Sequence, residues 1–409
     1  MTATHSSTNN KVMANETAPT TYTIVAVEGG GTSFRLAVCE TTVGDTKNSN
    51  DQLESASSES STKIIARVEV DSSHDNPQKT LLDCVEFLLA HKPKDGYDAL
   101  GLATFGPVGV NEHDPQKFGH ILPTTPKPAW KGVDLLTPLR QACSGDKPLA
   151  VLVDTDVNAP ALAEYLEELP RRPLISTVSY ITVGTGIGVG LVVNGKCVHG
   201  RMHPEGGHIA VQPLPNDSFP GYSWGVDNCP YHGRHTVEGL ASSVALTERL
   251  EQITESQTKL DRSVLKDLSD DHELWDHAAN ALANLCASLM LTLSMEKIVL
   301  GGGLMKRKVL LDKIRQRTVT LLNGYLGNFS EQDMAEIITL SRHGDDAGLN
   351  GAIVLAKQAL VSQLGSEAEA SAEKKLKQVA FGHGLWHGMI VGAVAAAVVV
   401  KYVLWPKRR

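Results

Sequence analysis

Residues 149–159 read Leu149-Ala150-Val151-Leu152-Val153-Asp154-Thr155-Asp156-Val157-Asn158-Ala159, an apolar run that passes directly into acidic and amide side chains. The apolar run predicts a buried strand of a parallel sheet. In open α/β folds ligands bind at the carboxyl ends of such strands, so we expect a general base among these acids. The alternative is that Asp154 or Asp156 caps a helix that begins near Ala159, since Asp is a favoured capping residue.

Composition limits the class of protein. The chain has 409 residues, of which 42% are apolar, and this is long enough for two packed domains. Its net charge of −8 argues against a nucleic-acid partner, because no basic stripe is present to neutralise phosphates. A small anionic or neutral ligand fits better. The six cysteines are scattered and no signal peptide opens the chain, which indicates a reducing compartment.

Glycine-rich turns occur between strand-like runs in both halves of the chain. The first is Glu28-Gly29-Gly30-Gly31-Thr32-Ser33, and the second is Gly184-Thr185-Gly186-Ile187-Gly188. Backbone N–H groups in such turns can approach a phosphate closely, although one such turn alone is more often only a tight turn. Neither is a Walker loop, and a strand follows each, which argues against a dinucleotide-binding fold. The repetition suggests duplicated domains that hold one polyphosphate from both sides.

Other loops at strand ends extend this pattern. The strand-like run 99–105 continues into Gly106-Pro107, and residues 119–130 are too rich in proline for regular structure. Loops of fixed shape often line binding clefts. A further apolar run, 297–300, leads into Gly301-Gly302-Gly303, against which we expect an adenosine to lie.

Residues with metal-binding side chains gather in one irregular stretch. His208 follows Glu205-Gly206-Gly207, and a Gly/Pro-rich segment contains Cys229, His232 and His235. Any one of these histidines alone is more often a solvated loop residue. Together, one Cys and three His have the donor types and close spacing of a structural zinc site.

From Tyr22 to Leu360 the chain resembles the ROK (repressor, open reading frame, kinase) sugar kinases, and within them the bacterial fructokinase branch. The motifs that carry the resemblance are Val27-Glu28-Gly29-Gly30-Gly31-Thr32, Phe105-Gly106-Pro107, Thr125-Pro126-Lys127-Pro128-Ala129-Trp130, Asp154-Thr155-Asp156-Val157-Asn158, Gly184-Thr185-Gly186-Ile187-Gly188, Glu205-Gly206-Gly207-His208 and Cys229-Pro230-Tyr231-His232-Gly233. Their number and their order make the resemblance specific.

The resemblance implies an α/β fold of two domains, the actin-like and hexokinase-like (ribonuclease H-like) ATPase fold. The expected domains are residues 22–150 and residues 151–360, the second with the zinc loop. It also implies transfer of the γ-phosphoryl group of ATP to a hexose, with Mg²⁺ as the activating ion and a homodimer as the assembly.

The same resemblance assigns roles to individual residues. Asp156 is the expected general base, and a carboxylate in reach of the sugar hydroxyl suits that role. The expected nucleotide-binding residues are Gly29, Gly30, Gly31, Thr32, Gly184, Thr185, Gly186, Gly188, Gly301, Gly302 and Gly303. The expected sugar-binding residues are Asn158, Glu205, His208 and Glu238.

The chain departs from the family pattern at several positions. Glu28 stands where most of the wider family has Asp, but the fructokinase branch commonly has Glu there. Ala129 replaces a common Gly. The last zinc ligand falls on His235 when counted from Cys229, but on Thr236, which cannot bind zinc, when counted back from Glu238-Gly239. We expect zinc to be bound by His208, Cys229, His232 and His235.

The sequence patterns at the two ends of the chain do not belong to a kinase domain. Residues 1–21 are polar and without hydrophobic periodicity, which predicts a disordered tail. Residues 361–384 are typical of a linker that can be helical. Residues 385–405 are apolar except for His387 and Lys401, and as a helix they would reach roughly 30 Å, about the thickness of a bilayer core. This predicts a single transmembrane helix.

A span at the very end of the chain predicts tail-anchored insertion, with the kinase domain facing the cytosol. The short span and its basic end favour the outer membrane of mitochondria or plastids, or the peroxisomal membrane. The competing interpretation is a buried or amphipathic terminal helix, but residues 392–400 are apolar on every face.

Other functions stay open at this stage. The kinase could prefer mannose, glucose or N-acetylmannosamine to fructose. The chain could also be a sugar-responsive regulator, since ROK repressors share this domain, but residues 1–20 are too short and too polar for a helix-turn-helix. A membrane-bound sugar sensor without turnover is a third possibility, against which the presence of Asp156 and of the glycine turns argues.

Overall fold

A computed structural model describes residues 20–43, 62–222 and 235–382. Residues 1–19 of the predicted N-terminal tail, Cys229 and His232 of the zinc loop, and the predicted transmembrane helix 385–405 therefore lie outside the described residues, whereas Thr21 of the predicted tail begins the first strand. The chain divides into two compact units, residues 1–359 and residues 360–409. Both sheets, and all the residues discussed below as parts of a site, belong to the first unit.

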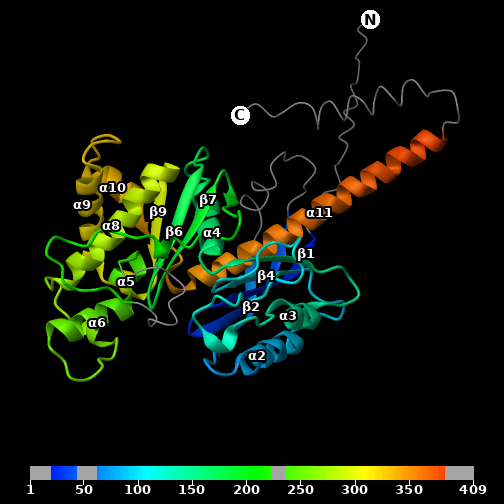
Figure 1. The fold of residues 1–409 in the computed structure, drawn as a ribbon. Coiled ribbons are helices and arrows are strands. Elements are labelled where there is room, and N and C mark those ends of the chain that lie inside the picture. Colours follow the sequence, from blue (N-terminus) through cyan, green and yellow to red (C-terminus); the bar gives the residue numbers. More distant parts are fainter. Residues whose placement is uncertain (1–19, 44–61, 223–234, 383–409) are drawn as a thin grey trace, which may run out of the picture. The chain divides into compact units, whose positions relative to one another are not determined.

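The N-terminal sheet has the strand order β3-β2-β1-β4-β5 (Figure 1). Its strands are β1 (Thr21–Gly29), β2 (Ser33–Thr42), β3 (Thr62–Asp71), β4 (Ala99–Thr104) and β5 (Ala150–Thr155). Strands β1 to β3 pair antiparallel, whereas β4 pairs parallel with both β1 and β5. The carboxyl ends of β1, β4 and β5 consequently meet at one edge of the sheet.

The second sheet has the strand order β10-β9-β6-β7-β8. Its strands are β6 (Thr177–Val183), β7 (Ile187–Val193), β8 (Lys196–Cys197), β9 (Lys297–Gly301) and β10 (Ile338–Leu340). Strands β6 to β8 pair antiparallel, and β9 pairs parallel with both β6 and β10. The two sheets thus have the same topology in the same chain order, which confirms the duplication expected from the two glycine turns.

Helices cover the sheets. The α-helices are α2 (Pro77–Ala90), α3 (Leu136–Cys143), α4 (Asn158–Glu168), α5 (Val237–Ala241), α6 (Ser243–Ile253), α7 (Val264–Asp267), α8 (Leu274–Leu293), α9 (Lys308–Leu322), α10 (Glu331–Ile337) and α11 (Ala347–Gly382). The 3₁₀ turns are η1 (Pro128–Trp130), η2 (Gly206–His208), η3 (Gly303–Lys306) and η4 (Gly344–Asp346). In Figure 1, α2 lies beside α3 on the first sheet and α8 lies beside α9 on the second.

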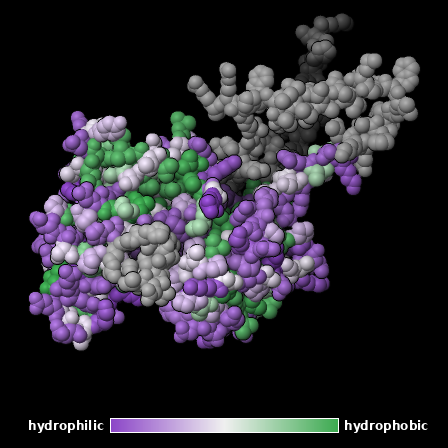
Figure 2. Space-filling model, viewed as in Figure 1, coloured by the Kyte–Doolittle hydropathy of each residue, from purple (hydrophilic) through white to green (hydrophobic). Residues whose placement is uncertain are grey.

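Each sheet has its own apolar core. In the first, strand residues such as Val27 and Leu102 pack against Leu88 of α2 and Leu139 of α3, all fully buried. In the second, Ile181 and Leu300 pack against α8, whose Trp275 is also fully buried. The face in Figure 2 is mainly hydrophilic with smaller hydrophobic patches, as expected when most apolar side chains are inside. These cores hold the strand ends that carry the site.

The C-terminal part differs from the prediction. Helix α11 runs without interruption from Ala347 to Gly382, so most of the predicted linker continues the last helix. Its residues 366–374 are exposed and include the charged Glu367, Glu369, Glu373 and Lys374. Within the described ranges no helix is long and apolar enough to cross a membrane. The predicted membrane localisation, a single pass with the kinase domain facing the cytosol, is therefore corrected: no described helix supports it.

Candidate active site

A pocket of about 660 Å³ is lined by loops from both sheets. From the first sheet come Gly31 and Thr32 of the first glycine turn, and Asp156 after β5. The second sheet contributes the second glycine turn, which follows β6, and the loop that carries Glu205. The two repeated turns thus open onto the same cavity, as the sequence predicted.

Asp156 is the first residue after β5. Its backbone N–H donates to Thr104 O of β4 (2.9 Å), so the hydrogen-bonded ladder holds this residue where the strand ends. Burial and, to a smaller extent, the charge of Glu28 raise the pKa of the Asp156 carboxyl to about 7, while the positive charge of Lys127 opposes the shift. A carboxylate with a pKa near the working pH suits proton transfer in either direction.

Asp154, two residues earlier, has another role. Its Oδ1 accepts a hydrogen bond from Asn158 Nδ2 (3.0 Å), and its Oδ2 lies 2.9 Å from His199 Nε2. It does not line the pocket. The N-cap residue of α4 is Val157, which makes no side-chain cap hydrogen bond, and the N–H of Asn158 donates to Thr155 Oγ1 (2.9 Å). Neither aspartate therefore acts as the cap of α4, and only Asp156 faces the cavity.

Asn158, predicted to bind sugar, is fully buried and does not line the pocket. Its Oδ1 accepts from the N–H of Leu191 in β7 (3.0 Å), and its Nδ2 donates to Asp154. The side chain joins the start of α4 to the second sheet. The structure therefore places Asn158 outside the pocket lining, where its side chain holds α4 against β7.

The first glycine turn is closed by the N–H of Gly30, which donates to Ser33 O (2.9 Å). Gly31 and Thr32 line the pocket. Gly29 ends β1 and lies against the side chains of Thr104 and Phe34. Of the four predicted phosphate-binding residues in this turn, two face the cavity directly.

The second glycine turn is closed by the N–H of Gly184, which donates to Gly186 O (3.0 Å). All of its predicted residues line the pocket, namely Gly184, Thr185, Gly186 and Gly188. Gly186 packs closely against Glu238: a Cβ there would lie 2.5 Å from Glu238 Oε2, and this carboxylate would have to shift. That carboxylate oxygen accepts from the N–H of Ile187 (2.8 Å). The position of the Glu238 carboxylate and the conformation of the second glycine turn therefore depend on each other.

The third glycine run does not line the pocket. Gly302 has φ +89°, and a Cβ there would lie 2.5 Å from Val183 O, directly before the second turn. The run thus supports the second turn from behind. Its contact with an adenosine stays a prediction.

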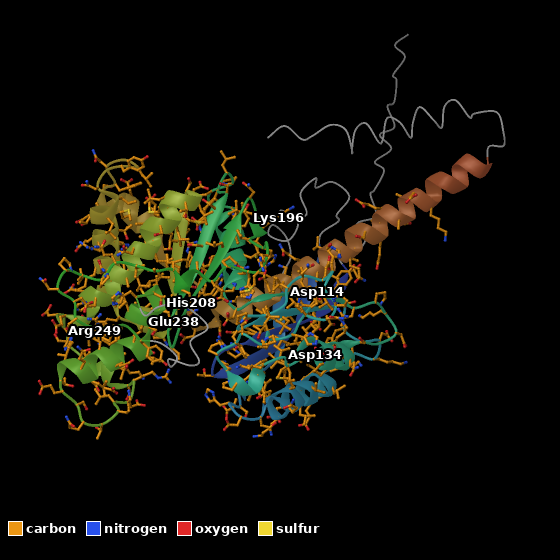
Figure 3. The ribbon with its side chains drawn as sticks, in the orientation of Figure 1. Asp114, Asp134, Lys196, His208, Glu238 and Arg249 are labelled. Carbon is orange, nitrogen blue, oxygen red and sulfur yellow. The ribbon has the colours of Figure 1, made fainter. Side chains whose placement is uncertain are left out.

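The three remaining predicted sugar-binding residues come together in the pocket, which Glu205, His208 and Glu238 all line. Residues 209–211 pair antiparallel with 235–237, and this register places His208 opposite Glu238 (Figure 3). Glu205 Oε2 lies 3.8 Å from His208 Nε2. Burial raises the pKa of Glu205 to about 7, with smaller contributions from Asp156 and Glu238, and burial lowers the pKa of His208.

Residues that sequence reasoning did not assign also face the pocket. Lys127 lies in the proline-rich loop, and its Nζ donates to Gly31 O (3.0 Å). His203 Nε2 accepts from the N–H of Val108 (3.1 Å), and its Nδ1 is 3.5 Å from Glu205 Oε1. Lys127 could have been found from its position between two prolines. A lone histidine such as His203 gives no signal in the sequence.

The carboxylate of Glu28, at the end of β1, is buried and fits a nearby cation. Its Oε1 pairs with Arg35 Nη2 (2.6 Å), and its Oε2 has no hydrogen-bond partner among the described residues. Burial raises the pKa of Glu28 although Arg35 opposes the shift. A buried carboxylate oxygen without a partner is costly unless something binds it. Mg²⁺ prefers such oxygen ligands.

The zinc prediction is only partly within the described residues. Of its four ligands, His208 and His235 are described, and the register places the exposed His235 opposite Val211 and His208 opposite Glu238. No cluster of three or more His, Cys, Asp or Glu residues able to hold a metal is found in the described ranges. The described part of the chain thus shows no zinc site.

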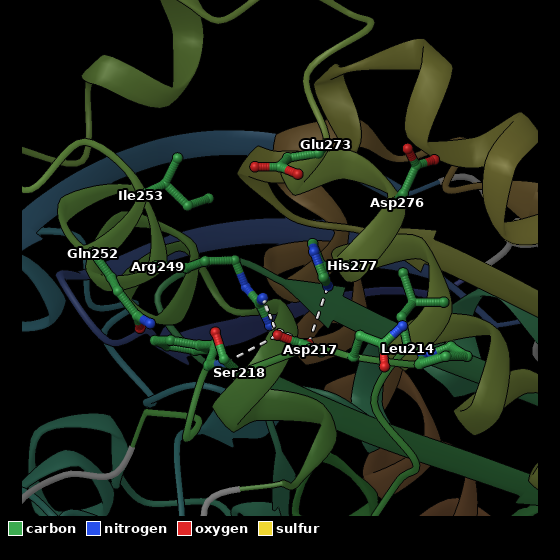
Figure 4. Close-up of a pocket in the computed structure, with 12 residues that line it drawn as sticks. Leu214, Asp217, Ser218, Arg249, Gln252, Ile253, Glu273, Asp276 and His277 are labelled. Carbon is green, nitrogen blue, oxygen red and sulfur yellow. Dashed lines mark hydrogen bonds and ion pairs between the residues drawn. The ribbon is translucent and has the colours of Figure 1, made fainter.

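A second pocket, of about 430 Å³, lies between α6, α8 and residues 214–219 (Figure 4). Its centre is an ion pair in which Arg249 donates to Asp217 twice (2.6 and 2.9 Å), with both side chains almost fully buried. His277 Nδ1 lies 3.1 Å from Asp217 Oδ2, and the Arg249 guanidinium lies over the Phe219 ring. No glycine turn reaches this pocket, so we place the chemistry in the first one.

Comparisons with known proteins agree with this assignment. The ROK family model matches residues 24–359. A fructokinase from Zymomonas mobilis is 34% identical over 337 residues, which cover 81% of this chain and 95% of that protein. A fructokinase from Pediococcus pentosaceus is 30% identical over 335 residues, covering 82% of this chain and 98% of that protein.

Solved structures resemble the fold. The ROK hexokinase from Thermus thermophilus has a TM-score of 0.57 and 22% identity, covering 82% of this chain and 97% of that one. A ROK family glucokinase from Streptomyces griseus in complex with glucose and AMPPNP has a TM-score of 0.56 and 21% identity, covering 82% and 99%. The predicted α/β hexokinase-like fold is thereby confirmed, without its transmembrane helix.

Proposed function

The chain belongs to the ROK family, and from this membership and the geometry of the pocket we propose that it is an ATP-dependent hexose kinase with fructose as its substrate. The observation that carries the proposal is Asp156, a carboxylate with a pKa of about 7 that shares one cavity with two glycine turns. The fructokinases at 30% and 34% identity support fructose as the acceptor.

In the proposed reaction Asp156 accepts the proton of the sugar hydroxyl while the hydroxyl oxygen attacks the γ-phosphorus of ATP in line. The new P–O bond forms as the bond to the β-phosphate oxygen breaks, and ADP leaves with that electron pair. N–H groups of the turns at 29–32 and 184–188 hold the phosphates. Glu28 and Asp156 are the carboxylates that would hold Mg²⁺, and the ion when bound would supply positive charge to the phosphoryl oxygens.

Sugar recognition is assigned to Glu205, His208 and Glu238. The two carboxylates accept hydrogen bonds from hydroxyls, and the imidazole, kept neutral by burial, can donate or accept. A sugar that lacks the right hydroxyl would leave these buried groups unpaired, which discriminates strongly. Asn158 contributes by holding α4 against β7 rather than by contact with the sugar.

We retain zinc as part of the proposal, with His208, Cys229, His232 and His235 as the ligands. Because His208 is also assigned to the sugar site, removal of zinc should weaken sugar binding and destabilise the loop together. Metal analysis of the purified protein should find about one equivalent of zinc per chain. A content near zero would reject this part. We also propose that the protein is a homodimer. Light scattering, which gives the molar mass of the purified protein in solution, tests this.

The test of the activity is a coupled assay of ADP release with fructose, mannose, glucose and N-acetylmannosamine. We expect the highest kcat/KM with fructose. A different preferred hexose would correct the substrate but keep the kinase. If fructose binds in a calorimeter but no hexose releases ADP, the chain is a sugar-binding regulator and the proposal fails.

A further inference from the structure

Lys127 has a position in the pocket that the roles assigned so far do not use. It lies in the proline-rich loop of the first half, and its Nζ is 3.0 Å from Gly31 O of the first glycine turn. The same ammonium lies over the ring of Phe105, 3.5 Å from the centroid. Lys127 and Asp156 both line the pocket. One cation therefore lies beside the proposed phosphate-binding turn and faces the proposed base.

The loop around Lys127 is held firmly. Thr125 is buried, and its Oγ1 donates to Gly106 O (3.2 Å). Trp130 is also buried, stacks on Phe34 with 5.5 Å between centroids, and donates from Nε1 to Ser73 O (3.1 Å). Pro126 and Pro128 fix the backbone dihedrals on either side of Lys127. A charge held this way is preorganised, which is what stabilisation of a transition state requires.

The charges in the cavity indicate which ligand this cation suits. Among the described residues that line the pocket, Lys127 and Arg262 are the only Lys and Arg, against the carboxylates of Asp75, Asp156, Glu205 and Glu238. Arg262 donates to Thr185 Oγ1 (2.6 Å), at the second turn. Across the described ranges, no carboxylate lies within ion-pair distance of Lys127. Its ammonium is thus a desolvated cation available to an anionic ligand.

We propose that the Lys127 ammonium binds the γ-phosphoryl group of ATP and remains with it as it passes to the sugar. This rests on the proposed kinase function. The proton of the attacking hydroxyl goes to Asp156, the bond to the β-phosphate oxygen breaks, and Lys127 keeps its own proton throughout. It acts through its charge on the three transferred oxygens, and is a catalytic residue because it touches the reacting group.

The first experiment measures binding of two probes by calorimetry, β,γ-imido-ATP with Mg²⁺ and ADP with Mg²⁺. For Lys127→Met we expect about 10–100-fold weaker binding of β,γ-imido-ATP, the range for a lost hydrogen bond to a charged group. Binding of ADP, which has no γ-phosphoryl group, should change little. Lys127→Arg keeps the charge and should retain much of the affinity.

The matched control is Lys131→Met, four residues further along the same loop. Lys131 is exposed and does not line the pocket, so both nucleotides should bind this variant as they bind the wild type. The kcat of Lys127→Met should fall about 10²–10³-fold, as for other preorganised donors to a transition state. A circular dichroism spectrum that matches the wild-type spectrum will show that each variant is folded.

Nucleotide binding measured as a function of pH distinguishes a role of the Lys127 charge from a purely structural role. Burial lowers the pKa of Lys127 to about 8 in the free protein, and the facing charge of Asp156 opposes that shift. In the free protein the Lys127 ammonium therefore loses its proton above pH 8. A bound phosphate would keep this side chain protonated. Binding of β,γ-imido-ATP should weaken from pH 7.5 to 9.5 in the wild type but not in Lys127→Arg. Asp156 and Glu205, each with a pKa of about 7, are mostly ionised over this range, and they titrate alike in the wild type and in Lys127→Arg.

The outcomes separate this inference from the kinase proposal. Equal losses for β,γ-imido-ATP and ADP, or a raised KM for fructose with unchanged nucleotide binding, would overturn the role of Lys127. A wild-type protein that releases no ADP with any hexose would reject the kinase. If that inactive protein still showed the Lys127-dependent difference between the two nucleotides, the phosphate contact would stand without the kinase.

Discussion

Burial gives Asp156 a pKa of about 7, and this sets the pH dependence of the reaction. Below pH 7 the carboxyl holds a proton and cannot accept one, so kcat/KM should fall about tenfold per pH unit on the acid side.

The Asp156→Asn variant should lose about 10²–10⁴-fold in kcat while it still binds fructose and ATP. Initial rates and calorimetry on the same preparation check both. Wild-type turnover in the folded variant would remove Asp156 from the mechanism.

The raised pKa also has a consequence for stability. A carboxyl whose pKa is higher in the folded protein than in the unfolded chain stabilises the fold at low pH, and that contribution is lost as the pH rises through about 7. Replacing Asp156 with Asn removes the buried charge. At pH 8 we therefore expect Asp156→Asn to unfold at a urea concentration equal to or higher than the wild type does. A lower midpoint would show that the carboxylate is stabilised by contacts other than those described.

At the scale of the element, the second glycine turn offers a matched pair of substitutions. In Gly186→Ala the new methyl group would approach Glu238 Oε2, which accepts from the N–H of Ile187. In Gly184→Ala the methyl group would meet no atom within 4 Å. Because the first change displaces a proposed sugar ligand, it should weaken fructose binding measured without nucleotide, and Gly184→Ala should not. Equal fructose affinities for the two variants would contradict the role of Glu238.

At the scale of the whole molecule, ion pairs join the first sheet to the turn before α11. Arg35 of β2 pairs with Glu28 and with Asp346, and Arg67 of β3 also pairs with Asp346. Asp346 precedes the start of α11 by one residue. Residues more than 300 positions apart in the sequence are thereby connected. Of these pairs, Arg35–Glu28 is the most buried and should contribute most.

Removal of Arg35 should therefore be costly. Arg35→Gln leaves the buried Glu28 carboxylate without its partner, and we expect a loss of about 3 kcal/mol of unfolding free energy at pH 7. The loss should shrink as the pH falls and Glu28 takes up a proton. Lys306→Met is the control, because its pair with Asp345 is exposed and should contribute under about 1 kcal/mol. Urea denaturation at pH 7 and pH 5 measures both, and equal small losses would show that Glu28 is solvated in the folded protein.

The sequence by itself determined the architecture, because the signals involved are local. A run of apolar residues that ends in glycine or aspartate marks a strand end wherever it occurs, and the same hairpin pattern at 22–38 and 179–196 was enough to predict duplicated sheets. The family resemblance also assigned Glu205, His208 and Glu238 to one expected sugar site. The predicted membrane localisation was wrong; it rested on the hydropathy and length of residues 385–405 and on the basic end of the chain.

The tertiary structure decided the role of each side chain. Asp154 and Asp156 look alike in the sequence, but the end of β5 directs Asp156 into the cavity while Asn158 and His199 bind Asp154. Gly302 belongs to a glycine run predicted to bind adenosine, and only the structure shows that it packs against Val183. Lys127 meets Gly31 across almost a hundred residues. Burial, charge and pKa depend on such distant neighbours, and no local pattern in the chain records which neighbours a side chain will meet.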